Sequence, residues 1–305
     1  MEMLLCLVFG PLLISYISYY LKLIKRYCTK NSIKIKKTPN IEIKENVKID
    51  DEEIKKFVKK SIKIKNFNKS FFYHNVSNLK INTCDTFRKF NIFIAEYDCV
   101  KNIIYITSNH SLAHELTHAS SSYYDGDDYS GLSQNGLGIG INEGYTELLT
   151  ERYYFHGDSY PVERKIANNL EKITEKDKME ECYYTANLYD FVEELKQYDS
   201  EENVLNFLNC VDIISDLVDN YVLCRLYYHM LIKCMKKANL YLLKWYAIKQ
   251  KRLLENNLIS DKQCYSNIIK YSKRLIELRN MESIRYKILG NKLIKKEIEK
   301  ILVKK

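Results

Sequence analysis

The sequence predicts an α+β fold, with a small sheet and two site helices, a mostly helical part after them and a membrane helix before them. Residues 90–96 and 102–107 are β-prone runs around a short polar turn, as in a hairpin. Apolar residues at helical spacing dominate residues 161–305, and residues 3–21 are almost continuously apolar. The expected parts are a transmembrane anchor, a basic linker, a domain with the candidate site, and a helical domain: 1–24, 25–50, 51–160 and 161–305.

Several helices are expected outside the candidate site. A helix over residues 52–60 begins with acidic side chains, which suit the positive end of the helix dipole. In the helical domain the apolar spacing is clearest over five stretches: 162–173, 183–195, 202–236, 240–256 and 281–303.

The apolar run near the start of the chain predicts a membrane span. As a helix, residues 3–21 would extend about 29 Å, close to the thickness of a bilayer's hydrocarbon core. Lys and Arg follow the run, so the positive-inside rule places the rest of the chain in the cytoplasm. A secretory signal peptide fits poorly, because no Lys or Arg precedes the run. A buried helix of a soluble protein is the alternative.

Composition excludes some classes of protein. The 46% of apolar residues are enough for a packed core. The net charge of +9 comes mainly from Lys that is interspersed with Asp and Glu. A nucleic-acid-binding element would gather Lys, Arg and aromatic residues together, so no nucleic-acid partner is expected. The nine Cys are odd in number and form no C-x-x-C pair, which argues against a disulfide framework and a structural zinc ribbon and fits a cytosolic location.

The sequence H-E-L-T-H at residues 114–118 predicts a metal site. It lies in an expected helix that Ser108 or Ser111 can cap. Residues four apart share one helix face, so His114 and His118 can offer ring nitrogens to one zinc ion. Glu115 projects beside the pair, where a carboxylate can take a proton from a metal-activated water. His110 lies one turn earlier and is interpreted as a helix-entry residue.

A second expected helix, residues 142–154, supplies the missing ligand. Catalytic zinc usually has three protein ligands and a free fourth position. Glu143 can be the third ligand, and Glu147, one turn later, can accept the outer ring N–H of a ligand histidine. Since an isolated H-E-x-x-H occurs by chance in roughly one chain in a hundred of this length, this second motif carries much of the argument.

H-E-x-x-H followed by N-E-G-x-x-E resembles the gluzincin metallopeptidases, the thermolysin-like clan, over residues 103–154. The resemblance implies a zincin-like catalytic domain in which His114, His118 and Glu143 bind zinc. It also implies that Glu115 is the general base and that Glu147 takes the acidic position behind a ligand histidine. In that clan an edge strand beside the cleft holds an extended peptide, so the resemblance implies a peptide or protein substrate. The aminopeptidase sequence G-x-M-E-N is absent, and an endopeptidase is expected.

Two more side chains are candidates for stabilising the transition state. Residues 120–139 are polar and Gly-rich and are expected to form a loop or lid at the rim of the cleft. Tyr129 in this loop could stabilise an oxyanion, although packing is the simpler role. A calcium loop is a weak alternative there, because the spacing does not match an EF-hand. The resemblance also implies a Tyr or His from the helical part, for which Tyr227, Tyr228 and His229 are candidates.

The expected function is that of a membrane-anchored, zinc-dependent peptidase with Glu115 as general base. Two alternatives stay open from the sequence. One is a zinc-binding regulatory protein that binds a partner and cleaves little or nothing. The other is a membrane-anchored helical interaction protein in which the motif is incidental.

Overall fold

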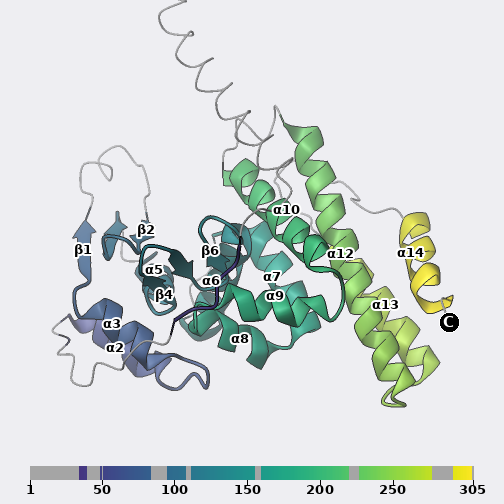
Figure 1. Ribbon diagram of the computed structural model, residues 1–305, viewed down its shortest axis with the longest axis horizontal. Helices are drawn as coiled ribbons and strands as arrows, with labels where there is room; N and C mark the ends of the chain where they lie inside the picture. The colour runs from purple at the N-terminus through teal and green to yellow at the C-terminus, as the bar shows by residue number, and fades with distance from the viewer. Residues whose placement is uncertain are drawn as a thin grey trace, which may run out of the picture. The chain divides into compact units, whose positions relative to one another are not determined.

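The computed structural model describes residues 34–39, 49, 51–83, 95–107, 111–154, 159–219, 227–276 and 291–303. In these ranges the predicted α+β class is confirmed, with eleven helices and two small sheets (Figure 1). The described residues from Ile35 onward belong to one compact unit. The expected anchor, residues 1–24, and most of the linker lie outside the described ranges. None of the described helices is both long enough and apolar enough to cross a membrane.

The first sheet contains a hairpin where the sequence predicts one, although the first predicted strand, residues 90–96, is described only at 95 and 96 and the observed strand continues to residue 98. Strand β2 (Ala95–Asp98) runs antiparallel to β3 (Ile103–Ile106), with Ala95 opposite Ile106. Strand β1 (Lys80–Thr83), which the sequence did not indicate, runs parallel to β3 on its other side. Buried Ile104 and Ile106 fix β3 in the core. The described order β1-β3-β2 leaves β2 at an edge of the sheet.

The second sheet corrects a prediction. Residues 120–139 are not simply a loop, because they contain strands β4 (Ser122–Tyr124), β5 (Asp128–Ser130) and β6 (Ser133–Gln134) in an antiparallel meander. The glycines that indicated a loop serve the turns between these short strands. Gly126 and Gly131 have φ of 104° and 54°, values that a residue without a Cβ adopts easily.

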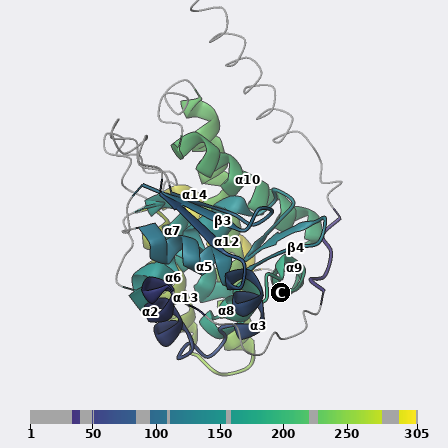
Figure 2. The same cartoon turned by 90° about the vertical axis from the view of Figure 1, so that its left-hand side faces the viewer.

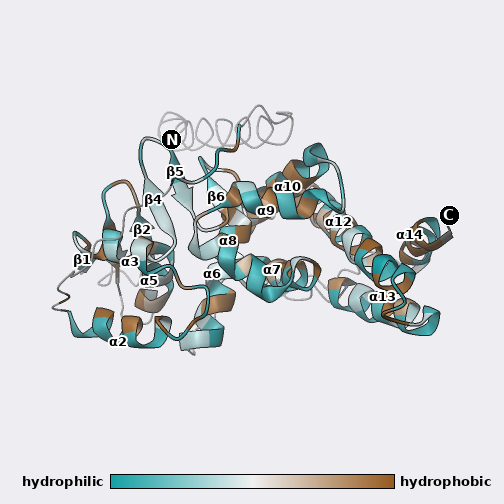
Figure 3. Cartoon of the chain, turned by 60° about the horizontal axis from the view of Figure 1, so that its bottom comes forward, coloured by the Kyte–Doolittle hydropathy of each residue, from teal (hydrophilic) through white to brown (hydrophobic). Residues whose placement is uncertain are grey.

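Helices α2 (Glu52–Ser61) and α3 (Lys69–Val76) precede the first sheet. The side chain of Asp51 accepts hydrogen bonds from the N–H groups of Glu53 and Ile54, which confirms the predicted start of α2. The apolar residues of α2 are brown in Figure 3, on an otherwise hydrophilic helix. Both helices pack against α5, the first site helix, on the side that faces the viewer in Figure 2.

The region after residue 160 is helical, as predicted, but its helix boundaries differ from the prediction. The stretch 183–195 is not one helix, because the chain breaks at Ala186, whose φ is 49°, and restarts at Asn187, whose side chain caps the next helix. The single helix expected over 202–236 is also wrong in part, because residue 227 lies in a turn and a helix starts after it, at residue 228, and continues to 255. The described helices are α7 (Pro161–Thr174), α8 (Lys176–Tyr184), α9 (Leu188–Lys196), α10 (Glu201–Asp219), α12 (Tyr228–Glu255), α13 (Asp261–Ile276) and α14 (Asn291–Val303).

These helices support the site through packing. Helices α10, α12 and α13 lie side by side in Figure 1, around a core that includes Phe207 and Trp245. Helix α10 also packs on α6 (Ile139–Tyr154), the second site helix, and α6 packs along α7. The expected domain boundary at residue 160 therefore falls between two helices that are in contact.

One buried carboxylate on α10 holds the start of α6. The two oxygens of Asp212 accept hydrogen bonds from the backbone N–H groups of Gly138 and Gly140, each at 2.9 Å. Asp212 is 1% exposed. A negative charge at this end of a helix also suits the helix dipole. Asp212 thus caps the second site helix from more than seventy residues away along the sequence.

We expect Asp212→Ala to lower the free energy of unfolding by about 3 kcal/mol, because two buried N–H groups lose a charged acceptor. Asp212→Asn, which keeps one acceptor oxygen, should lose less. Denaturant titration followed by circular dichroism measures both effects. Glu202→Ala, which removes an exposed acid from the same helix, is the control. Equal unfolding midpoints for Asp212→Ala and this control would show that the cap contributes little.

Candidate metal centre

Two helices that pack together supply the candidate ligands. Helix α5 (Leu112–Ala119) contains the H-E-x-x-H motif and is buried on nearly every side. It begins after Ser111 as expected, but the Ser111 side chain makes no capping hydrogen bond. Ser108 and His110 lie outside the described residues. Helix α6 starts three residues earlier than the predicted residue 142, at Ile139.

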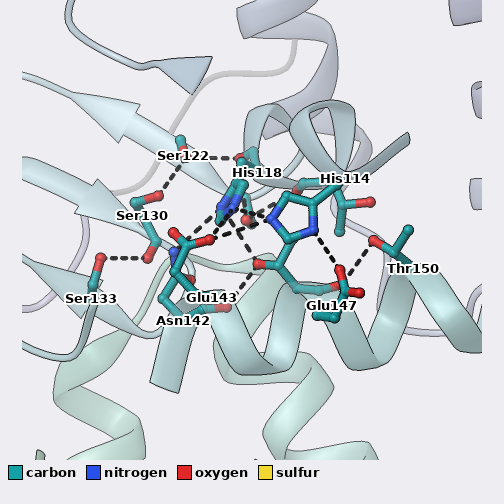
Figure 4. Close-up of polar contacts among 12 residues, drawn as sticks. His114, His118, Ser122, Ser130, Ser133, Asn142, Glu143, Glu147 and Thr150 are labelled. Atoms are coloured by element: carbon teal, nitrogen blue, oxygen red, sulfur yellow. Dashed lines mark hydrogen bonds and ion pairs between the residues drawn. The ribbon is translucent and has the colours of Figure 1, made fainter. Parts of the chain in front are cut away.

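The structure brings the three predicted ligands together (Figure 4). The Nε2 atoms of His114 and His118 are 3.1 Å apart. The Oε2 atom of Glu143 lies 3.3 Å from Nε2 of His114 and 3.2 Å from Nε2 of His118. Two ring nitrogens and one carboxylate oxygen thus form a nearly equilateral triangle at the interface of α5 and α6.

This triangle has the size that a metal ion requires. Ligand atoms about 2.1 Å from a tetrahedral zinc ion lie roughly 3.4 Å from one another. The observed edges of 3.1–3.3 Å are close to that separation. His114, His118 and Glu143 could therefore hold a metal ion, with a fourth position left for a water or a substrate oxygen.

Glu147 orients His114, as the sequence predicts. Its Oε2 atom lies 3.0 Å from Nδ1 of His114, and its Oε1 atom accepts a hydrogen bond from the Ser159 N–H at 2.7 Å. A proton on Nδ1 can be donated to the carboxylate, which leaves the lone pair of Nε2 facing the triangle. Glu147 is 2% exposed, so water competes little for this contact.

His118 is oriented by residues that the sequence analysis missed. Its Nδ1 atom lies 3.4 Å from both the Thr146 hydroxyl and the Asn142 amide nitrogen. The Thr146 hydroxyl donates to the backbone carbonyl of Asn142 and lies 2.6 Å from the Tyr183 hydroxyl, so its oxygen can accept the proton of Nδ1, which the Asn142 amide nitrogen, a donor, cannot. Thr146 lies between the two glutamates of α6, but Tyr183 lies on α8, and nothing in the local sequence connected it to the site.

Electrostatics favour a cation at the triangle. Burial disfavours the charged form of His114, but hydrogen bonds to Glu143 and Glu147 outweigh burial and raise its pKa to about 10. Burial likewise disfavours ionisation of Glu143, yet His118 and His114 hold its pKa well below its usual range. Positive charge therefore stabilises this cluster, and a divalent cation at the centre would supply it.

Glu115 lies in the same cleft as the triangle. This cleft, with a volume of about 230 Å³, is lined by Glu115, His118 and Glu143 and by residues of the edge strand β2. Burial raises the pKa of the Glu115 carboxyl above its ordinary value. A carboxylate whose pKa is raised toward neutrality is better suited to accept a proton at physiological pH.

Tyr160 is a cleft residue that the sequence analysis missed. Its ring stacks on His114 with centroids 5.6 Å apart, and it lines the cleft. It has a left-handed backbone, with φ of 50°, immediately before α7. This conformation is uncommon outside glycine and often marks functional positions. In the sequence, a Tyr directly before a Pro indicates only that a loop ends there, and it does not indicate a site residue.

The two predicted transition-state stabilisers lie elsewhere. Tyr129 is 3% exposed and packs with Phe71 and Tyr123, on the face of β5 opposite Asp128 and Ser130, which line the cleft. His229 is exposed at the start of α12, where its ring contacts Tyr228. Neither residue is among those that line the cleft around Glu115.

We expect Glu147→Ala to weaken metal binding roughly 10- to 100-fold, because His114 would lose the partner that fixes its tautomer and ring orientation. Competition with a fluorescent zinc chelator measures the affinity. Glu151→Ala is a matched control, since it removes an exposed acid one turn further along α6. Equal affinities for zinc in both variants would show that Glu147 does not support metal binding through His114.

Comparisons with known proteins identify no relative. No protein-family model, curated protein or solved structure matches the chain.

Proposed function

We propose that this protein is a zinc-dependent endopeptidase of the gluzincin type, with a zincin-like catalytic domain. The observation that carries the proposal is the triangle of His114, His118 and Glu143, with Glu115 in the cleft beside it. Two imidazoles and one carboxylate are the ligand set of thermolysin-like zinc sites. Imidazole nitrogens favour zinc over magnesium or calcium, which prefer oxygen ligands alone.

The residues of the chain have distinct roles in the proposed reaction. A bound zinc ion would polarise the substrate carbonyl and lower the pKa of a water molecule to about 7. Glu115 takes the proton of the attacking water and passes it to the leaving amine. Glu147 and Thr146 hold the two histidines in the tautomers that leave Nε2 free. Tyr160 is the candidate donor to the developing oxyanion, because it lines the cleft and contacts His114.

The edge strand β2 supports a peptide substrate. Ala95, Glu96 and Tyr97 of β2 line the same cleft as Glu115. In the described sheet β2 pairs only with β3, so its other side can pair with an extended peptide. The apolar run at residues 3–21 and the basic residues after it support a single-pass anchor with the catalytic part in the cytoplasm.

The test combines metal content with hydrolysis. Purified protein should contain about one zinc per chain and should cleave casein or a mixed peptide library. Chelation should abolish cleavage, and added zinc should restore it. Bound zinc without cleavage of any peptide would favour the alternative of a zinc-binding regulatory protein. Absence of bound zinc would reject both the peptidase and the zinc-binding regulatory protein. It would favour the alternative in which the H-E-x-x-H motif is incidental.

A further inference from the structure

The cleft beside the metal centre is acidic. Of the described residues that line it, four are carboxylates, Glu96, Glu115, Asp128 and Glu143, and none is Lys or Arg. A divalent cation offsets two of these charges. The charges of Glu96 and Asp128 then remain for the substrate. The whole chain has a net charge of +9, so the negative charge of the cleft is local and opposite in sign to the net charge of the molecule.

Asp128 is held in a fixed position. Its backbone N–H donates to the Asn135 side chain at 2.9 Å, and its carbonyl accepts from the Asn135 N–H at 3.0 Å. The Cys99 thiol donates to Oδ1 of Asp128 at 3.0 Å. Burial raises the pKa of Cys99, so this thiol stays protonated as a donor. No ion pair with a Lys or Arg of the described ranges neutralises the Asp128 carboxylate.

Strand alternation aims Asp128 at the cleft. Asp128 and Ser130 line the cleft, whereas Tyr129 between them packs in the core on the opposite face of β5. Glu96 also lines the cleft, from the edge strand β2, where it is exposed and is likewise without an ion pair in the described ranges. A peptide bound along β2 would thus meet two carboxylates that come from different sheets.

We propose that this cleft selects peptides with a Lys or Arg side chain next to the scissile bond, and that Asp128 and Glu96 recognise its charge. The position of the Lys or Arg next to the cleaved bond rests on the proposed peptidase function. The recognition itself needs only that a peptide binds in the cleft. A hydrogen bond to a charged group in a partly buried site changes affinity roughly 10- to 100-fold.

The experiment measures binding separately from hydrolysis. Zinc-loaded Glu115→Gln protein is titrated by calorimetry with matched peptides that carry Lys, acetyl-lysine or Glu at one position. The Lys peptide should bind about 10-fold more tightly than the acetyl-lysine peptide. Adding Asp128→Asn, which keeps the acceptor for the Cys99 thiol, should remove most of this difference, and Glu96→Gln should reduce it. Asp128→Lys should reverse the preference in favour of the Glu peptide.

One control variant and the wild-type protein separate the possible failures. Glu202→Gln removes the same charge from an exposed position on α10 and should leave the Lys preference unchanged. Equal binding of the three peptides, or a preference that persists in Asp128→Asn combined with Glu96→Gln, would overturn the inference. Failure of the wild-type protein to cleave any peptide would instead count against the proposed function. A Lys preference in binding without cleavage would support the inference and reject the peptidase.

Discussion

Glu115→Gln is expected to lower peptide hydrolysis by roughly 10²- to 10⁴-fold while zinc content stays the same. Glutamine has nearly the shape of glutamate, so the packing of α5 should persist. It cannot accept the proton of an attacking water, and that is the role proposed for Glu115. The triangle of His114, His118 and Glu143 does not include the Glu115 side chain, so the affinity for zinc should change little.

The measurement is a progress curve on a peptide that wild-type protein cleaves, together with elemental analysis of the same preparation. Glu202→Gln is the matched control, because it makes the same substitution on the exposed face of α10. If Glu115→Gln kept both its zinc and more than half of the wild-type rate, Glu115 would not be the general base. Loss of zinc in this variant would mean instead that Glu115 supports the metal centre.

The second large effect is expected from Glu143→Ala, which should lose stoichiometric zinc. Only two imidazoles, 3.1 Å apart on one helix, would remain as protein ligands. The variant would also leave His114 and His118 without the carboxylate that stabilises positive charge between them. Ala favours helix, so α6 itself should form normally. Zinc per chain after dialysis should fall from about one to near zero, and hydrolysis should fall with it.

Glu151→Ala is the control for this experiment, two turns further along α6, where the carboxylate is 53% exposed and pairs with Arg164. Its zinc content should equal that of the wild-type protein. Circular dichroism would establish that Glu143→Ala is folded. A folded Glu143→Ala that binds zinc with unchanged affinity would show that Glu143 is not the third ligand.

Local sequence predicted much of the fold because its signals were periodic. The spacing of apolar residues located α7 to within a residue at each end, since one face of that helix packs in the core. The same signal failed at residues 183–195, where two amphipathic helices follow each other with only Thr185 to Asn187 between them. A hydropathy pattern does not reveal a single residue, such as Ala186, whose backbone adopts a left-handed conformation and ends a helix.

The small second sheet shows another limit of the sequence. Glycines and aspartates over residues 120–139 indicate turns but do not show that the intervening residues pair. The pairing depends on contacts with other parts of the chain, for example the burial of Tyr129 against Phe71 of α3. The hairpin of β2 and β3 was partly predictable, because the β-branched residues of β3 and the turn before them are adjacent in sequence.

The sequence by itself determined which side chains share a helix face: His114 with His118, and Glu143 with Glu147, because helical periodicity is a local property of the backbone. Only the tertiary structure decided that the two faces meet, with Glu143 3.2–3.3 Å from both imidazoles. It also brought in the cap from Asp212, the contact of Tyr183 with Thr146, and the ring of Tyr160. Each of these depends on packing between segments distant in the chain, and local spacing contains no information about such packing.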